Sequence, residues 1–199
     1  MAQPVLILAS RSPRRADLLR QIGVPIEVLE ADIDESPRRG EAPTACARRL
    51  AELKAKTVFE RTAGRLPVLG ADTIVVVGGV PLGKPASDSE HLRMLERLSG
   101  QSHEVVTAVC LMTAHHAFSE VVTTTVEFSL IEAETAAAYV ATGEGRDKAG
   151  GYGIQGIGGI FVKRLVGSYS AVVGLPLAET ESFLRQAGLD TWQNRQHEI

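Results

Sequence analysis

Hydrophobic positions along this chain follow two patterns. Nearly continuous apolar runs at residues 5–9 and 66–77 are typical of strands buried on both faces. Apolar residues recur every three or four positions within residues 16–21, 44–62 and 88–98, which predicts helices. Two further strands are expected at 103–112 and 118–128, and a short helix at 132–142. Strand and helix segments therefore interleave along most of the chain.

The junction after the first apolar run places positive charge at a helix start. Ser12 reads as an N-cap and Pro13 as the first helical residue, so Arg14 and Arg15 fall in the first turn. Each cation there costs about 0.3 to 1 kcal/mol against the helix dipole. A bound anion such as phosphate would offset this cost. The alternative is that the arginines bend into solvent or pair with acidic neighbours.

The run at 66–77 contains a carboxylate at Asp72, beside Thr73. An ionised carboxylate among apolar residues loses several kcal/mol of hydration unless a cation or hydrogen-bond donors meet it. We expect Asp72 to have such a partner, and the neighbouring Gly70 suggests close approach by an external group. A structural aspartate satisfied by backbone amides is the alternative. Lys54, on the apolar face of helix 44–62, either reaches a phosphate or extends to water.

Eight of the 19 glycines lie between Gly143 and Gly159, which indicates a binding loop. Its G-x-G-x-x-G match is followed by a strand, expected at 160–165, and not by the helix that a dinucleotide site requires. Within it, the amide of Gln155 can match the edge of uracil or thymine, or it is simply solvated. A near P-loop match at residues 78–85 is rejected because Pro85 replaces the magnesium-binding hydroxyl, although Lys84 can still serve a phosphate.

Composition limits the classes of function. The 199 residues, 44% hydrophobic, suffice for one domain. A net charge of −3 gives no general attraction to nucleic acid or to a membrane, no apolar run is long enough to span one, and the N-terminus lacks a leader pattern, so we expect a cytoplasmic protein. Isolated cysteines, and three histidines interpreted as surface residues (His103, His115 and His116), are assigned no chemistry. The carboxylates of Asp32, Asp34 and Glu35 either share a cation or belong to a solvated loop.

Four motifs occur in order along nearly the whole chain, followed by a closing Gly-Leu-Pro-Leu. They are Leu-Ala-Ser-x-Ser-Pro-Arg-Arg at 8–15, Gly-Ala-Asp-Thr at 70–73, Gly-Lys-Pro at 83–85 and Asp-Lys-Ala-Gly-Gly-Tyr-Gly-Ile-Gln-Gly at 147–156. Together they resemble the Maf family of nucleoside triphosphate pyrophosphatases. The Tyr-Gly-Ile-Gln-Gly loop is similar to the branch that acts on dTTP and UTP, rather than to the branches that act on 7-methyl-GTP or on CTP and modified uridine triphosphates.

The resemblance implies a role for each matching residue. Asp72 would be the proton acceptor, with Lys54 and Lys84 as further catalytic groups. Three residues would read the base, and five would surround the phosphates and a divalent metal, Mg or Mn, held by Glu35 and Asp72. The base-reading residues are Arg14, Thr73 and Gln155, and the others are Ser10, Arg15, Glu35, Lys54 and Lys84. Arg11 stands at a position that the family leaves variable.

The resemblance also implies an architecture and assembly. The expected fold is α/β, a curved mixed β-sheet flanked by helices, with a cleft between two lobes. The chain would be one domain over residues 1–199 with a polar tail from about 190, and it would assemble as a homodimer.

The expected reaction is hydrolysis of dTTP or UTP to the nucleoside monophosphate and pyrophosphate, with Asp72 activating water. Alternatives are the same chemistry on the substrates of the other branches, or a non-catalytic nucleotide-binding regulator of cell division, a process to which the family has been linked. DNA binding through Arg38-Arg39 and Arg48-Arg49 conflicts with the negative net charge.

Overall fold

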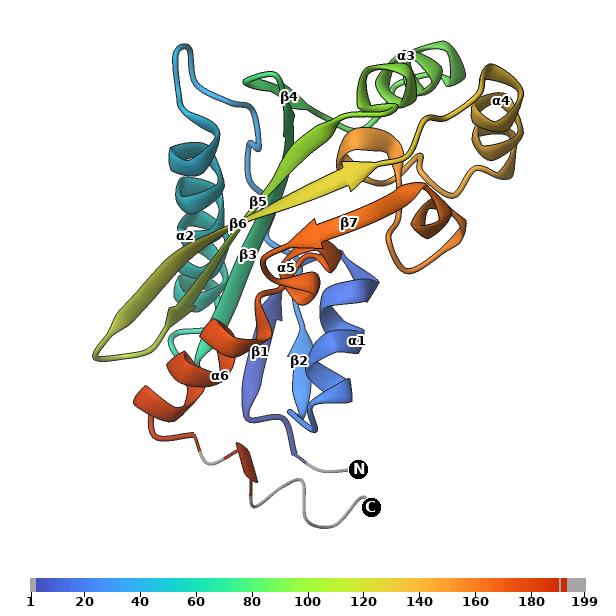
Figure 1. The fold of residues 1–199 in the computed structure, drawn as a ribbon. Helices are drawn as coiled ribbons and strands as arrows, with labels where there is room; N and C mark the ends of the chain where they lie inside the picture. The colour runs from blue at the N-terminus through green and yellow to red at the C-terminus, as the bar shows by residue number, and fades with distance from the viewer. Residues whose placement is uncertain (1–2, 190, 193–199) are drawn as a thin grey trace. The chain divides into compact units, whose positions relative to one another are not determined.

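The computed structural model describes residues 3–189, 191 and 192, whose course is drawn in Figure 1. In chain order, the elements are β1 (Leu6–Ala9), α1 (Pro13–Gln21), β2 (Ile26–Val28), α2 (Pro43–Arg61), β3 (Val68–Val77), β4 (Val80–Leu82), α3 (Asp88–Leu98), β5 (Ser102–Met112), β6 (Ala117–Phe128), α4 (Ala133–Thr142), the 3-10 helices η1 (Ala149–Gly151) and η2 (Ile157–Phe161), β7 (Val162–Val166), α5 (Tyr169–Val173) and α6 (Leu177–Gln186).

The strands of the described chain form one seven-stranded mixed sheet flanked by helices. Its order is β2-β1-β3-β5-β6-β7, with β4 paired to β3 as a hairpin. β1 is parallel to both β2 and β3, whereas the β3–β4 and β6–β7 pairs are antiparallel. The α/β fold with a mixed sheet, expected from the motif resemblance, is thereby confirmed.

The chain forms two compact units. The first contains the described residues up to Asp72, Thr107–Val122 and the described residues from Gly174 onward; the second contains Thr73–Val106 and Thr123–Val173. Strands β3, β5 and β6 each contribute residues to both units. The candidate residues are therefore described below unit by unit.

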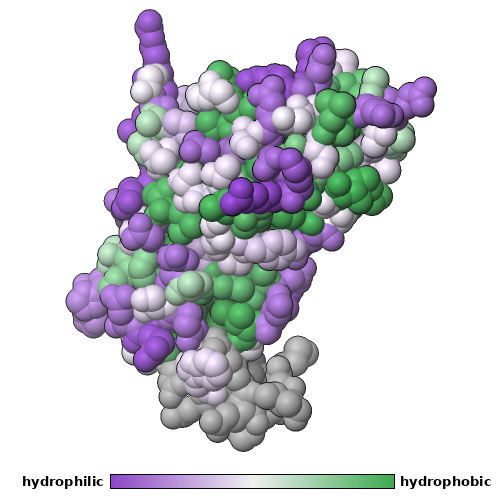
Figure 2. All heavy atoms as spheres, in the orientation of Figure 1, coloured by the Kyte–Doolittle hydropathy of each residue, from purple (hydrophilic) through white to green (hydrophobic). Residues whose placement is uncertain are grey.

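The first unit is built around β1. All four residues of β1 are buried, as expected for a strand with parallel neighbours on both sides. α1 packs against β2 and α2 against β1, in the blue to teal part of Figure 1. α2 begins with Pro43 at its first turn, after a loop, residues 34–40, whose side chains are exposed. Figure 2 shows hydrophilic residues along this projecting loop at the upper left.

The second unit has its own hydrophobic core. Side chains from β3, α3, β5, β6 and α4 meet Tyr152 and Phe161 of the glycine-rich segment there. α3 begins after its N-cap residue Ser87, whose hydroxyl accepts a hydrogen bond from the Glu90 amide at 3.2 Å. Figure 1 shows α3 and α4, which contact each other, side by side.

One local prediction is wrong. The strand expected at 160–165 is Val162–Val166, because residues Ile157–Phe161 form a 3-10 helix whose glycines permit tight turns. The predicted polar tail, residues 190–199, lies almost wholly outside the described residues.

Candidate active site

Two carboxylates of the first unit converge on one ammonium group. Lys54 Nζ lies 2.7 Å from Asp72 Oδ1 and 2.8 Å from Glu35 Oε1. The side chains of Lys54 and Asp72 are buried, whereas about half of the Glu35 side chain is exposed, at 53%. The partner that the apolar surroundings of Asp72 demand is therefore Lys54, and the lysine points inward rather than to water.

A close approach of α2 to β3 makes this ion pair possible. A Cβ atom at Gly70 would lie 2.7 Å from the Ala55 amide nitrogen and would also overlap the Ala51 carbonyl oxygen. Only glycine allows the helix backbone to come this near to the strand. The expectation that Gly70 marks the approach of an external group is wrong, because the approaching group is the backbone of α2.

A second buried cation of the first unit is held by the chain itself. Arg15 is 8% exposed; its Nε donates to the Gly174 carbonyl at 2.7 Å and its Nη1 to Ser10 Oγ at 3.1 Å. Ser10 Oγ also accepts from the Ser12 amide at 3.1 Å. Ser12 is the N-cap residue of α1 but makes no side-chain cap bond, so the hydroxyl of Ser10 serves the helix start instead.

The charges around Arg15 are of both signs. Burial lowers the pKa of Arg15 from its usual value, Asp72 and Glu35 oppose this effect, and Arg14 adds to it. Arg14, half-buried at the second position of α1, thus belongs to the same electrostatic group. Arg11 instead pairs with Glu30 at 2.9 Å on the surface. Of the predicted site residues, the structure gathers Ser10, Arg14, Arg15, Glu35, Lys54 and Asp72 in this unit.

The remaining three predicted residues belong to the second unit. Thr73 directly follows Asp72 in β3 and is half-buried. Lys84 is exposed after β4, where the Gly83 carbonyl accepts a hydrogen bond from the Gly150 amide at 3.0 Å. Gln155 is exposed in the turn between η1 and η2. Their predicted roles stay predictions.

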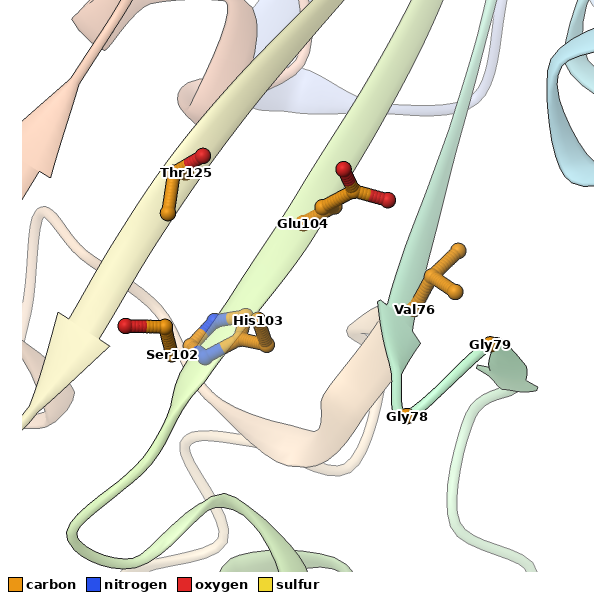
Figure 3. Close-up of a pocket in the computed structure, with 7 residues that line it drawn as sticks. All are labelled: Val76, Gly78, Gly79, Ser102, His103, Glu104 and Thr125. Carbon is orange, nitrogen blue, oxygen red and sulfur yellow. The ribbon is translucent and has the colours of Figure 1, made fainter.

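A hollow of about 310 Å³ in the second unit is a poor candidate for a triphosphate site. Its lining residues are Val76, Gly78, Gly79, Ser102, His103, Glu104 and Thr125 (Figure 3). Burial lowers the pKa of His103 to about 4, so that its ring is neutral at pH 7. The charged side chain left in this lining is the Glu104 carboxylate, which repels phosphate.

The same histidine corrects a sequence interpretation. His115 and His116 are exposed as expected, but His103 is 2% exposed, and its Nε2 lies 2.8 Å from the Tyr152 hydroxyl. The alternation of β5 explains this, since Ser102 and Glu104 on either side are exposed.

The residues predicted to hold a divalent cation are Glu35 and Asp72. Within the described part of the chain, no group of three or more histidine, cysteine, aspartate or glutamate side chains is arranged to hold a metal. Mg²⁺, however, is commonly held by one or two carboxylates together with substrate phosphates. Because both carboxylates already converge on one cationic point, at Lys54 Nζ, they fit that mode of binding.

Sequence reasoning missed one member of this group, the Gly174 carbonyl that holds Arg15. A backbone acceptor 159 positions away leaves no side-chain signal in the sequence. In the described ranges no helix is both long and apolar enough to cross a bilayer.

Comparison with known proteins shows the family to which this chain belongs. Residues 5–187 match the family model described as "Maf-like protein". The chain belongs to this family, as its motifs indicate.

Individual relatives narrow the class further. Three proteins named dTTP/UTP pyrophosphatase are similar to this chain over most of their length. The protein of Alcanivorax borkumensis is 53% identical over 95% of this chain and 98% of its own. The protein of Pseudoalteromonas atlantica is 50% identical over 93% and 98%, and that of Escherichia coli O157:H7 is 51% identical over 90% and 91%. A solved dITP/XTP pyrophosphatase of Mycobacterium abscessus, with a TM-score of 0.41 and 16% identity over 62% of this chain and 73% of its own, is too distant to bear on fold or function.

Proposed function

We propose that this protein hydrolyses dTTP and UTP to the nucleoside monophosphate and pyrophosphate. Family membership and three relatives of that name at 50–53% identity support the proposal. The structural observation that carries it is the convergence of Asp72 and Glu35 on Lys54 Nζ in the same unit as the buried Arg15. This group combines an inward carboxylate with fixed positive charge.

The positive groups of the first unit would bind and stabilise the phosphates. Cleavage between the α and β phosphorus atoms builds up negative charge on the oxygens that attack and leave, and fixed cations in a dry site stabilise that charge. Arg15 is held in one place by Ser10 and Gly174, so its charge needs little rearrangement during the reaction. The N-terminus of the nine-residue helix α1, next to Arg14, adds backbone donors of the same sign.

Asp72 would take the proton from the attacking water. Its Oδ1 is held by Lys54 Nζ at 2.7 Å, which orients the carboxylate and leaves Oδ2 to act as the general base. Glu35 and Asp72 would together hold Mg²⁺ or Mn²⁺. When bound, such an ion supplies further neutralisation of phosphate charge. Transfer of the water proton to Asp72 is the step that this chain's own residues perform.

The base would be recognised by Arg14, Thr73 and Gln155, and Lys84 would contact a phosphate. The family motifs support these roles, and the exposed amide of Gln155 suits the donor and acceptor edge of a pyrimidine. The homodimer expected from the family is likewise part of the proposal.

The first experiment is a substrate panel. Purified protein is incubated with Mg²⁺ or Mn²⁺ and with dTTP, UTP, CTP, 7-methyl-GTP or modified uridine triphosphates, and pyrophosphate release is measured. We expect kcat/KM to be highest for dTTP and UTP. A preference for another triphosphate would identify a different branch, and nucleotide binding without release would favour the regulator.

The second experiment removes the base. Asp72→Asn keeps an oxygen for Lys54 to contact, so the variant should fold and bind nucleotide, while kcat falls about 100-fold or more. Asp17→Asn, the same change at an exposed residue paired with Arg20, is the matched control. Near-normal release by Asp72→Asn would contradict the role of Asp72.

A further inference from the structure

The turn that carries Gln155 is held from outside by two side chains. Gln155 is exposed, between the buried Gly153 on one side and Ile157 and Gly158 on the other. The carboxylate of Glu144 and the hydroxyl of Tyr139, which lies in α4, contact the backbone on both sides of this turn. The position of Gln155 is therefore set by residues that lie earlier in the chain.

Four hydrogen bonds make up this arrangement. The Ile157 amide donates to Glu144 Oε2 at 2.7 Å, and the Gly158 amide donates to Oε1 at 2.9 Å. The Tyr139 hydroxyl donates to Glu144 Oε1 at 3.1 Å and accepts from the Gly153 amide at 3.3 Å. One carboxylate and one phenol thus connect the two ends of the turn, and hydrogen bonds to a charged acceptor are the stronger kind.

The glycines of the turn leave room for these two side chains. A Cβ atom at Gly156 would lie 2.6 Å from the carboxyl carbon of Glu144. A Cβ atom at Gly158 would lie 2.9 Å from the Tyr139 hydroxyl oxygen. Glycine at both positions lets the backbone close around Glu144 and Tyr139, which gives a physical reason for part of the glycine-rich pattern.

The charge of Glu144 is stabilised by the same contacts. Burial opposes ionisation, but the hydrogen bonds from Gly158, Ile157 and Tyr139 outweigh it, so the pKa of Glu144 lies below its usual value. Burial also raises the pKa of Tyr139, and the nearby Glu144 charge acts in the same direction. At pH 7 the pair is an ionised acceptor and a neutral donor.

We propose that Glu144, together with Tyr139, is a positioning residue for base recognition: it fixes the turn that presents Gln155 to the nucleobase. The inference rests on the proposed function and adds the residues that set its specificity. Glu144 contacts the backbone of the turn that carries Gln155, so its loss should affect how well the pyrimidine is bound and distinguished.

The test compares kinetic constants of three variants. In Glu144→Gln an NH₂ group replaces one of the two carboxylate oxygens. An NH₂ group cannot accept a hydrogen bond from the Ile157 or Gly158 amide, so at least one hydrogen bond is lost. We expect KM for dTTP to rise about tenfold with kcat within about threefold, and the preference for dTTP over CTP to fall about tenfold. Tyr139→Phe should shift KM in the same direction but less. Glu134→Gln, an exposed glutamate of α4, is the matched control.

A second measurement separates positioning from general damage. Amide hydrogen exchange in residues 153–158 should speed up in Glu144→Gln more than exchange in the rest of the protein. Loss of folded protein would instead lower kcat at an unchanged KM.

The inference and the proposed function can fail separately. If the unsubstituted protein releases no pyrophosphate from any triphosphate, the proposed function is wrong and the inference falls with it. If that protein is active but Glu144→Gln matches Glu134→Gln in KM, in the dTTP to CTP ratio and in exchange, the inference alone is wrong.

Discussion

At the scale of single residues, the charged groups in apolar surroundings carry most of the information. Asp72 lies in an apolar strand and Lys54 on the apolar face of a helix, and each position conflicts with its surroundings unless a partner is present. In the structure each satisfies the other at 2.7 Å. The prediction that Asp72 has a partner is therefore confirmed, and the partner is Lys54.

Replacing Lys54 tests how far stability and activity depend on this lysine. Lys54→Met keeps most of the aliphatic stem but leaves the buried Asp72 carboxylate without its cation and beside Glu35. We expect the free energy of unfolding to fall by about 3 kcal/mol and kcat to fall about 100-fold. Urea unfolding and pyrophosphate release measure the two effects.

The matched control is Lys56→Met on the same helix. Lys56 makes an exposed pair with Glu60 at 3.8 Å, so its loss should cost less than about 1 kcal/mol. Equal destabilisation by both substitutions would show that the Lys54 pairs contribute no more than a surface contact.

The sequence indicated charged residues of the candidate site but not the groups with which they interact. Arg14 and Arg15 signalled unbalanced positive charge, but nothing local indicated that the Gly174 carbonyl would hold Arg15. His103 was misread because three histidines were judged as a set, whereas strand alternation buries this one alone. The prediction did not include Glu144, although its position between Gly143 and Gly145 was visible in the sequence.

At the scale of elements, the packing of α2 on β3 places Lys54. Gly70→Ala would put a Cβ atom 2.7 Å from the Ala55 nitrogen, so the helix must move away from the strand. We expect a loss of about 1 to 3 kcal/mol of stability and a fall in kcat as Lys54 is drawn from Asp72. Chemical denaturation and pyrophosphate release follow the two changes.

Gly83→Ala provides the comparison for stability. A Cβ atom at Gly83 has no neighbouring atom within 4 Å, so this variant should unfold within about 0.5 kcal/mol of the original protein. If Gly70→Ala were as stable as Gly83→Ala, the close helix–strand contact would not be needed.

Helices and strands were predicted correctly where the hydrophobic periodicity extended over many residues. Helix α2 was expected at 44–62 and is Pro43–Arg61; the strands expected at 103–112 and 118–128 are Ser102–Met112 and Ala117–Phe128. The prediction failed in the glycine-rich segment, where amides of the 3-10 helix Ile157–Phe161 donate hydrogen bonds to the Glu144 side chain, 13 and 14 positions earlier in the chain. Local pattern alone does not contain those contacts.

At the scale of the whole molecule, the four motifs and their order predicted more about fold and family than the amino-acid composition did. The four motifs implied the α/β fold and the family, both of which are confirmed. The motif resemblance implied two lobes, but the sequence did not show where one unit ends and the other begins. The boundary falls inside strands β3, β5 and β6, between residues such as Asp72 and Thr73 that are adjacent in the chain. No break in composition marks those positions.

Stability of the whole protein should fall on mild acidification because of His103. Burial lowers its pKa from 6.5 to about 4, so between these values the unfolded chain binds a proton that the folded protein does not. Unfolding then becomes more favourable as the pH falls, by about 2 kcal/mol from pH 7 to pH 5. Carboxylates with lowered pKa values, such as Glu41 at about 2, lose their contribution to stability only at lower pH.

Two histidine variants test this pH dependence in urea unfolding. His103→Gln, whose amide can still contact Tyr152, should remove most of the dependence of the unfolding free energy on pH, whereas His115→Gln, at an exposed position, should retain it. Equal pH slopes in the two variants would contradict a neutral buried His103.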